Sequence, residues 1–176
     1  MIQDKIVDKK RYVHKPTQTD ELYFVIQVPE TFHIQNLDVS VQSEYWVLAN
    51  KDISNTANYL LPINDPDKNT RVIYAAFRKD ANYLTPSEIR DQRVRMGLSL
   101  RELSQILGFS YSTLSEIENN KRLQNQLQET ALEMMLNKTE LYRLFKNRSR
   151  QLKQRISKLQ YDRVETALIM AIPKQK

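Results

Sequence analysis

The hydrophobic pattern divides the chain into two parts with different periods. Over residues 21–80, short runs of aromatic and β-branched residues are separated by turn-forming residues, a pattern typical of strands. Three such runs predict strands, namely residues 22–28, 43–49 and 71–77. Residues 58–63 are a weaker candidate, because Pro62 would confine such a strand to a sheet edge. From Leu84 onward, apolar residues recur every three or four positions, which predicts helices.

The fold class that follows is α+β, with a small β-rich module before an all-α domain. Residues 1–20 are polar and lack apolar periodicity, so we predict a flexible arm there. Four of the cations of this arm are Lys9, Lys10, Arg11 and Lys15. They belong either to a solvated tail or to a segment that touches DNA. The aromatic residues of the module are expected in its core, with a base-stacking surface as the alternative.

Three short helices are predicted between Leu84 and Arg122. The only two glycines of the chain, Gly97 and Gly108, fall where one helix would stop and the next would start. Glycine adopts positive φ at little cost and often follows a helix. The residues that would cap the starts of these helices are Thr85, Ser99 and Ser110. Two short helices joined by a turn with glycine form a helix-turn-helix, whose second helix enters the major groove of DNA.

Residues 97–122, GLSLRELSQILGFSYSTLSEIENNKR, resemble the Xre/Cro-type helix-turn-helix of phage repressors, plasmid regulators and many bacterial antitoxins. The resemblance extends over residues 84–136 and implies a lambda-repressor-like fold. The sequence departs from the family pattern at three positions. Leu100 replaces a usual phosphate-binding glutamine, and Gln92 stands where the family has an apolar core residue. Asn120 replaces a common glycine, although asparagine also tolerates the left-handed conformation.

The second helix of this motif, residues 111–119, is the predicted recognition helix. Leu114 and Ile117 are expected to point inward, which leaves the other positions on outward or flanking faces. By resemblance to phage repressors, the base-reading residues are Tyr111, Ser112, Thr113, Ser115 and Glu116. The alternative for Ser112 and Thr113 is that they only help to cap the helix. The expected phosphate contacts are Ser99, Arg101, Asn119, Lys121 and Arg122.

Further helices are predicted after the motif. Residues 126–136 form a fourth helix, whose core residues are Leu127, Ala131, Leu132, Met135 and Leu136. Residues 137–176 form a basic amphipathic extension, mainly one helix over residues 139–160 that Thr139 caps. Its cations form a secondary basic patch, made of Arg143, Lys146, Arg148, Arg150, Lys153, Arg155 and Lys158. The apolar stripe of this helix either pairs with a second copy or packs on its own domain. Residues 164–172 are apolar nearly all round and are expected to be buried, in a dimer contact or against the N-terminal sheet.

Charge is unevenly distributed along the chain. Residues 1–85 hold ten lysines and arginines and eleven acids, whereas residues 86–176 hold seventeen and ten. The basic excess therefore belongs to the half with the predicted helix-turn-helix, as neutralisation of DNA phosphates requires. The net charge of +6 on its own would fit ordinary surface charge equally well.

Composition excludes several classes of protein. The absence of cysteine removes disulfides, thiolate metal sites and cysteine nucleophiles. The two histidines, His14 and His33, lack companions at ligand spacing, and no phosphate-binding glycine loop is present. We therefore expect no catalytic residue, metal or cofactor, and no enzyme. No apolar run reaches the length of a membrane span, and the N-terminus lacks a signal-peptide core, so a cytoplasmic protein without membrane contacts is expected.

The sequence thus predicts a sequence-specific DNA-binding transcriptional regulator, most simply a homodimeric repressor or autoregulator of an operon in a bacterium or a mobile element. The first alternative is an antitoxin or other partner-neutralising protein, whose N-terminal module binds a protein while the helix-turn-helix autoregulates the operon. The second alternative is an accessory protein that binds DNA in plasmid maintenance or conjugation.

Overall fold

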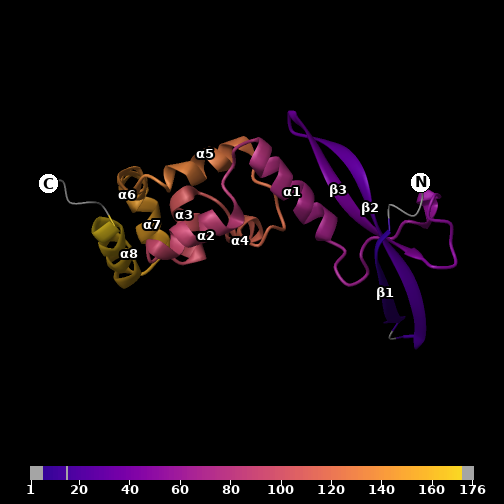
Figure 1. The fold of residues 1–176 in the computed structure, drawn as a ribbon. Coiled ribbons are helices and arrows are strands. Elements are labelled where there is room, and N and C mark those ends of the chain that lie inside the picture. Colours follow the sequence, from indigo (N-terminus) through magenta and orange to yellow (C-terminus); the bar gives the residue numbers. More distant parts are fainter. Residues whose placement is uncertain (1–5, 15, 172–176) are drawn as a thin grey trace. The chain divides into compact units, whose positions relative to one another are not determined.

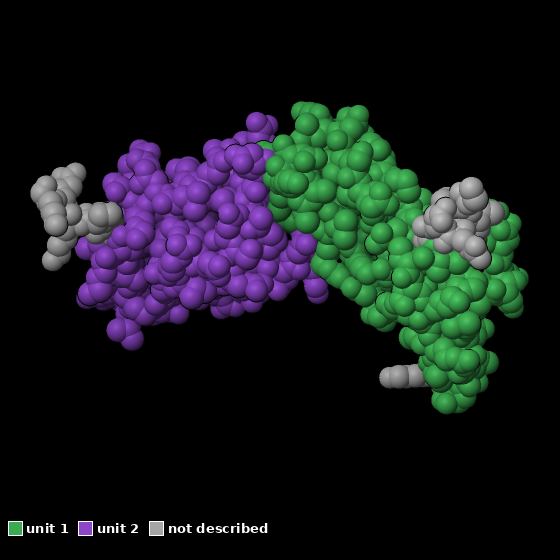
Figure 2. Space-filling model, in the orientation of Figure 1, with its two compact units in different colours: residues 1–81 green, residues 82–176 purple. Residues whose placement is uncertain are grey.

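A computed structural model describes residues 6–14 and 16–171 of the chain. The chain forms two compact units, of which unit 1 spans residues 1–81 and unit 2 spans residues 82–176 (Figure 2). Each unit has its own hydrophobic core.

Unit 1 is built on a three-stranded antiparallel sheet with the order β1-β2-β3 (Figure 1). The strands are β1 (Ile6–His14), β2 (Thr19–Ile34) and β3 (Leu37–Leu48). The central strand β2 pairs with β1 between Thr19 and Ile26, and with β3 between Tyr23 and Ile34. The far end of the β2–β3 hairpin is therefore a two-stranded ribbon that extends beyond β1.

Strand β1 shows that the expected flexible arm over residues 1–20 is wrong for residues 6–14. From Lys10 to His14, half-buried and exposed positions alternate along this strand, but several of the half-buried residues are polar. Charged side chains are common on edge strands because they discourage pairing between molecules. The hydrophobic pattern therefore gave no strand signal here. Lys15 of the expected arm lies outside the described residues.

Helix α1 (Lys68–Asp80) replaces the strand that was expected at residues 71–77. The aromatic and β-branched residues of this run fit a strand in composition. However, the half-buried Ile73 and the buried Phe77 are four positions apart, so they share one face of a helix. α1 packs against β3. These tertiary contacts outweigh the local preference of the residues for a strand.

The segment between β3 and α1 contains a short 3-10 helix, Thr56–Asn58, and an isolated bridge between Leu60 and Trp46. The weaker strand candidate at residues 58–63 is therefore wrong. The buried aromatic residues of unit 1 are Tyr23, Trp46 and Phe77. Their burial agrees with the core interpretation of the module's aromatic residues.

Unit 2 is helical over its described residues (Figure 1). The first four helices are α2 (Pro86–Arg95), α3 (Leu100–Leu107), α4 (Tyr111–Glu118) and α5 (Gln126–Met134). The C-terminal extension contains α6 (Lys138–Asn147), α7 (Ser149–Arg155) and α8 (Lys158–Ala171). The predicted caps are confirmed, because the side chains of Thr85, Ser99 and Ser110 each accept a hydrogen bond from the N–H group three residues on.

One hydrophobic core takes residues from every helix of unit 2. The extension contributes Leu141 and Phe145 from α6, Leu152 from α7, and Val164 and Leu168 from α8. Burying one large apolar side chain stabilises a fold by about 1.5–3 kcal/mol. The extension is therefore part of this domain. Of the two alternatives for its apolar stripe, packing on its own domain is the one observed.

The extension is not the single helix expected over residues 139–160. It breaks at Arg148 (φ −93°, ψ 5°) and again at Ile156, which is extended (φ −128°, ψ 156°). Thr139 is not the cap of α6, because the side-chain oxygen of Asn137 accepts from the Thr139 N–H at 3.1 Å. Neither Arg148 nor Ile156 is a glycine or a proline, so the sequence carries no strong helix-breaking signal at either break.

Several apolar residues that were expected in the core are exposed instead, namely Leu127, Leu136, Ile169 and Met170. On α8, Val164 and Leu168 point into the core of unit 2, whereas Ile169 and Met170 are exposed in the single chain. The residues of α8 are therefore not completely buried within unit 2, and their burial in a dimer contact stays a prediction. Residue 172 lies outside the described residues. No helix within the described ranges combines the length and the apolar character that a membrane span requires.

Candidate nucleic-acid interface

The turn between α3 and α4 is built from a left-handed glycine and a serine cap. Gly108 has φ of +81°, where a side chain would be strained. The N–H groups of Gly108 and Phe109 both donate to the Ser104 carbonyl at 2.8 Å and so close the end of α3. Ser110 Oγ then accepts from the Thr113 N–H at 3.0 Å and starts α4. The predicted corner is therefore confirmed.

Helix α4 buries one side and exposes the others. Leu114 and Ile117 are fully buried in the core of unit 2, as predicted for the inward-pointing residues. Of the predicted base-reading residues, Tyr111 and Ser112 are exposed, and Thr113, Ser115 and Glu116 are half-buried. These side chains give the accessible surface of α4 several hydrogen-bonding groups next to one aromatic ring.

The hydroxyl groups at the start of α4 bond to one another. Ser110 Oγ lies 2.9 Å from Ser112 Oγ and 2.8 Å from Thr113 Oγ1. Both the N–H and the hydroxyl of Thr113 are directed at Ser110, so the capping alternative fits Thr113 better than base reading. Ser112 is exposed, and its hydroxyl keeps further hydrogen-bonding capacity.

An ion pair that the sequence analysis missed holds the C-terminal end of α4 against α2. Arg93 Nε and Nη2 each donate to the Glu118 carboxylate at 2.7 Å, and Nη1 donates to the Leu98 carbonyl at 2.9 Å. The two side chains are only 12% and 2% exposed. The hydrogen bond to Glu118 raises the pKa of Arg93. Such a two-point pair fixes orientation as well as distance.

After α4 the chain passes through Asn120, which has a left-handed φ of 53°. This agrees with its position, where the family pattern commonly has a glycine. Before Asn120, Asn119 Nδ2 donates to the Ser115 carbonyl at 2.8 Å. Arg90 of α2 donates to Asn119 Oδ1 at 3.2 Å and to the Glu118 carbonyl at 2.6 Å. Arg90 therefore adds a cation beside a predicted phosphate contact, and sequence reasoning had not singled it out.

Lys121 and Arg122 are exposed just after this exit. The Lys121 N–H donates to the Glu116 carbonyl at 2.8 Å, and Arg122 Nη1 lies 3.5 Å from the Glu116 carboxylate. Exposed ion pairs of this kind contribute little to stability and exchange readily. A predicted phosphate contact and a predicted base reader are thus neighbours in the free protein.

At the N-terminal end of α3, Ser99 is engaged in capping, because its Oγ accepts from the Glu102 N–H and its N–H donates to the Glu102 carboxylate. Arg101 is exposed beside it. From α8, Arg163 donates to the Glu102 carboxylate and to the Gly97 carbonyl. Burial alone would raise the pKa of Glu102, but the hydrogen bonds from Arg163 and Ser99 outweigh it and lower that pKa.

We expect the stability of unit 2 to depend on the ionisation of Glu102. Because folding lowers this pKa, the carboxylate stabilises the fold above the ordinary value of 4.5, and this contribution is lost as the pH falls through the folded pKa. Glu102→Gln keeps a capping-box residue. In urea titrations from about pH 3 to pH 7, its free energy of unfolding should therefore vary less with pH than that of the unchanged protein.

Glu133→Gln, at an exposed acid of α5, is the matched control for this measurement. It should leave the pH profile unchanged. A Glu102→Gln profile that follows the unchanged protein at every pH would contradict the assigned role of Glu102.

The predicted secondary basic patch is divided among the helices of the extension. Two of its cations pair with acids at 2.7 and 2.6 Å, namely Arg143 with Glu140 and Lys146 with Glu165. Lys153 Nζ lies 4.7 Å from the centre of the Tyr161 ring. The exposed members are Arg143, Lys146, Arg150, Lys153, Arg155 and Lys158. The single basic helical face that was expected is therefore not formed.

The remaining member of this patch, Arg148, lies against the helix-turn-helix corner. A Cβ added to Gly108 would lie 2.4 Å from Arg148 Nη1. The corner needs glycine for its φ of +81°, whereas the end of the flexible Arg148 side chain could move to make room for a Cβ. The contact brings a cation of the extension next to the corner between α3 and α4, and helical spacing does not predict a contact between such distant positions.

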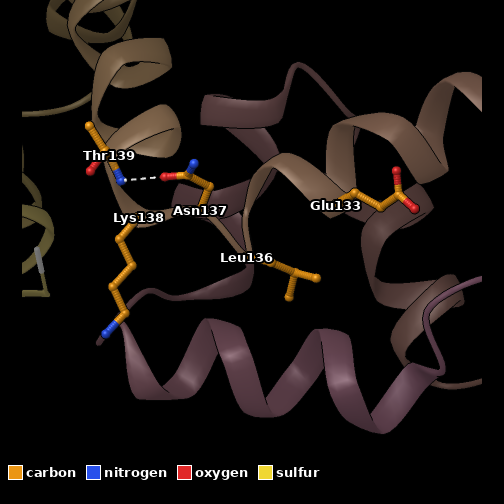
Figure 3. Close-up of a pocket in the computed structure, with 5 residues that line it drawn as sticks. All are labelled: Glu133, Leu136, Asn137, Lys138 and Thr139. Atoms are coloured by element: carbon orange, nitrogen blue, oxygen red, sulfur yellow. Dashed lines mark hydrogen bonds between the residues drawn. The ribbon is translucent and has the colours of Figure 1, made fainter.

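A pocket of about 590 Å³ lies where α5 is followed by α6 (Figure 3). It is lined by Glu133, Leu136, Asn137, Lys138 and Thr139. Figure 3 shows the Asn137 side chain turned toward the Thr139 N–H, which is the capping contact of α6. None of the predicted DNA contacts lines this pocket. Within residues 6–14 and 16–171, no group of three or more histidines or acids is placed to hold a metal ion.

Comparison with known families agrees with this geometry. Residues 89–127 match a family model described as helix-turn-helix. This segment is a helix-turn-helix. The match runs from Ile89 on α2 to the start of α5 and includes every predicted contact from Ser99 to Arg122. The helix-turn-helix supports a DNA-binding regulator. No curated protein and no solved structure matches the chain.

Proposed function

We propose that this protein is a sequence-specific, homodimeric transcriptional regulator that represses or autoregulates an operon of a bacterium or a mobile element. One observation carries the proposal. Within the matched helix-turn-helix, α4 follows a glycine corner, buries Leu114 and Ile117, and keeps a polar surface accessible. A helix held in this way fits the major groove of DNA, which is about 12 Å wide.

In this proposal the N-terminal part of α4 reads base edges. Ser112 hydrogen-bonds to a base, Glu116 accepts from a cytosine amino group, and Tyr111 packs on a thymine methyl group. Arg122 exchanges the Glu116 carboxylate, 3.5 Å away in the free protein, for a DNA phosphate. Binding then frees Glu116 for its base at the same time as it neutralises backbone charge.

The proposed phosphate contacts lie at both ends of the motif. Asn119, Lys121 and Arg122 follow the C-terminal end of α4, and Arg90 bonds to Asn119 there. Arg101 and the first N–H groups of α3 lie at the other end, where a helix start favours an anion. Contacts on both sides of a groove fix the register of the helix between them.

A homodimer is proposed because one short helix reads only a few base pairs. Two copies on half-sites about one helical turn apart, ~34 Å, double the contacts and give the specificity that a single domain lacks. The operator is then expected to be an inverted repeat.

Neutralising Lys121 and Arg122 should weaken binding to all DNA sequences similarly. Each phosphate contact adds about 0.9 to the slope of log affinity against log salt concentration, so Lys121→Gln with Arg122→Gln should flatten the slope by roughly 2. Fluorescence anisotropy at several salt concentrations measures this. Lys51→Gln with Lys79→Gln, two exposed lysines of unit 1, is the matched control. An unchanged slope in the first variant would remove both residues from the phosphate contacts.

A partner-neutralising protein, such as an antitoxin, is the second candidate. Unit 1 has its own sheet and core and lies wholly outside the matched segment, which supports a separate task for it. The interpretation as an accessory protein of plasmid maintenance or conjugation has less support. It relied on one continuous basic helix in the extension, and that helix is broken.

Selecting bound fragments from genomic DNA with the purified full chain tests the proposed function. The expected result is strong enrichment of a few promoter sites that share an inverted repeat. Uniform recovery of fragments, with a steep salt dependence, would contradict a sequence-specific regulator.

A further inference from the structure

The two edges of the sheet in unit 1 differ. The outer edge of β3 is closed at Glu44, whose N–H donates to the Asn69 side chain of α1 and whose carbonyl accepts from it, both at 2.8 Å. Two residues further on, Trp46 exchanges backbone hydrogen bonds with Leu60 at 2.8 and 2.9 Å. These contacts satisfy groups that an edge strand otherwise offers to another chain.

The outer edge of β1 has no comparable cover. No strand among the described residues pairs with this side of β1. Val7 and Val13, near its two ends, are 52% and 50% exposed, and the side chain of Arg11 is 72% exposed. In an antiparallel pair, every second residue directs its N–H and carbonyl away from the partner strand. One of these groups is engaged, because the Lys9 N–H donates to the Asp8 carboxylate at 2.7 Å. The other outward backbone groups of β1 are offered to a further strand.

Three consecutive cations decide which strand fits this edge. In the register of β1, Lys9 pairs with Phe24, so Lys9 and Arg11 lie on one face of the sheet and Lys10 lies on the other. Lys9 Nζ is 5.5 Å from the centre of the Phe24 ring, and Lys10 Nζ is 5.3 Å from that of Trp46. These contacts hold both ammonium groups close to the sheet.

A second copy of this strand is a poor occupant, because antiparallel pairing would bring its cations close to those of the first. Arg11 also pairs with Asp20 at 2.8 Å, but both side chains are exposed and such a pair exchanges easily. Residues 1–81 as a whole hold ten lysines and arginines and eleven acids, so unit 1 does not attract a polyanion in general. A short acidic strand suits the local charge and the open backbone together.

We propose that the outer edge of β1 binds an acidic, extended segment of another protein, which joins the sheet as a fourth strand. Main-chain hydrogen bonds supply affinity, and acids at alternate positions opposite Lys9 and Arg11 supply selectivity. Small apolar residues at the ends of the segment pack against Val7 and Val13. This site lies on unit 1, so it stands or falls independently of DNA binding by unit 2.

The test uses the full chain and two labelled peptides of about ten residues, one alternating glutamate with valine and the other alternating lysine with valine. In fluorescence anisotropy, the acidic peptide should bind at least about tenfold more tightly than the basic one. Amide hydrogen exchange should slow at β1 when the acidic peptide is bound, most strongly at every second residue.

Lys9→Glu with Arg11→Glu should reverse the preference between the two peptides. Lys51→Glu with Lys79→Glu makes the same change in net charge at exposed positions elsewhere in unit 1 and should keep the preference. Operator binding, measured in parallel, should be the same in all three proteins. Failure at β1 is thereby distinguished from failure of the DNA-binding proposal.

Three results would overturn the proposal. The first is no saturable binding of the acidic peptide at millimolar concentration, or binding that the reversal of Lys9 and Arg11 leaves unchanged. The second is charge-dependent binding without slower exchange at β1, since strand addition requires backbone hydrogen bonds. The third is binding of a short DNA duplex that is tighter than binding of the acidic peptide and that Lys9→Glu with Arg11→Glu abolishes, which would assign the edge to nucleic acid. Self-association of the protein that the same variant abolishes would likewise assign the edge to a second copy.

Discussion

Replacing Glu118 with alanine is expected to destabilise unit 2 by about 3–5 kcal/mol. The change removes both carboxylate acceptors of Arg93, whose side chain is only 12% exposed. The guanidinium is then left as a buried charge that the Leu98 carbonyl satisfies only in part. Urea unfolding of the full chain, followed by circular dichroism, measures the loss.

Two further variants give this measurement its controls. Glu116→Ala removes from the same helix an acid whose side chain is 45% exposed and should change the free energy of unfolding by no more than about 0.5 kcal/mol. Arg93→Met with Glu118→Met replaces the pair with apolar side chains and should be close to neutral, because no buried charge is left unpaired. Arg90 Nε, 3.8 Å from the same carboxylate, belongs to a side chain that is 48% exposed. A loss in Glu118→Ala no larger than that in Glu116→Ala would contradict the role of the ion pair.

Ser112→Ala with Glu116→Ala is expected to change which operator the protein prefers. Each base contact of this kind discriminates by about 1–3 kcal/mol, so affinity for the selected operator should fall roughly ten- to a hundredfold or more. Binding to random DNA should remain nearly intact, because phosphate contacts supply most of it. Competition binding with the selected operator and a random duplex measures both quantities.

The matched control is Thr130→Ala with Glu133→Ala, which removes a hydroxyl and a carboxylate from exposed positions of α5. It should leave both affinities unchanged. If Ser112→Ala with Glu116→Ala weakened operator and random DNA equally, base reading by α4 would be wrong.

The helix-turn-helix could be predicted from sequence because its determinants are local. Ser99 and Ser110 cap helices through N–H groups three residues away, and Gly108 ends α3 through its own φ. The inward positions Leu114 and Ile117 follow from helical spacing within one element. A short-range pattern was therefore enough to predict the motif, helix α4 and the residues at the surface of that helix.

The remaining structure depends on partners distant in sequence. Arg93 and Glu118 are 25 positions apart, and Arg148 approaches Gly108 from another helix, so neither contact follows from periodicity. Helix α1 has the composition of a strand and becomes a helix where it packs on β3. β1 is a strand whose half-buried positions include the polar residues Lys10 and His14, so the hydrophobic alternation that marks most strands is missing from it.

Methylation interference at guanine N7 on a selected operator tests most directly whether α4 enters the major groove, because N7 lies on the floor of that groove. We predict that methylation blocks binding in two clusters about one helical turn, ~34 Å, apart, and that Ser112→Ala with Glu116→Ala loses this interference. Binding that N7 methylation leaves unaffected throughout the protected region would contradict insertion of α4 into the major groove.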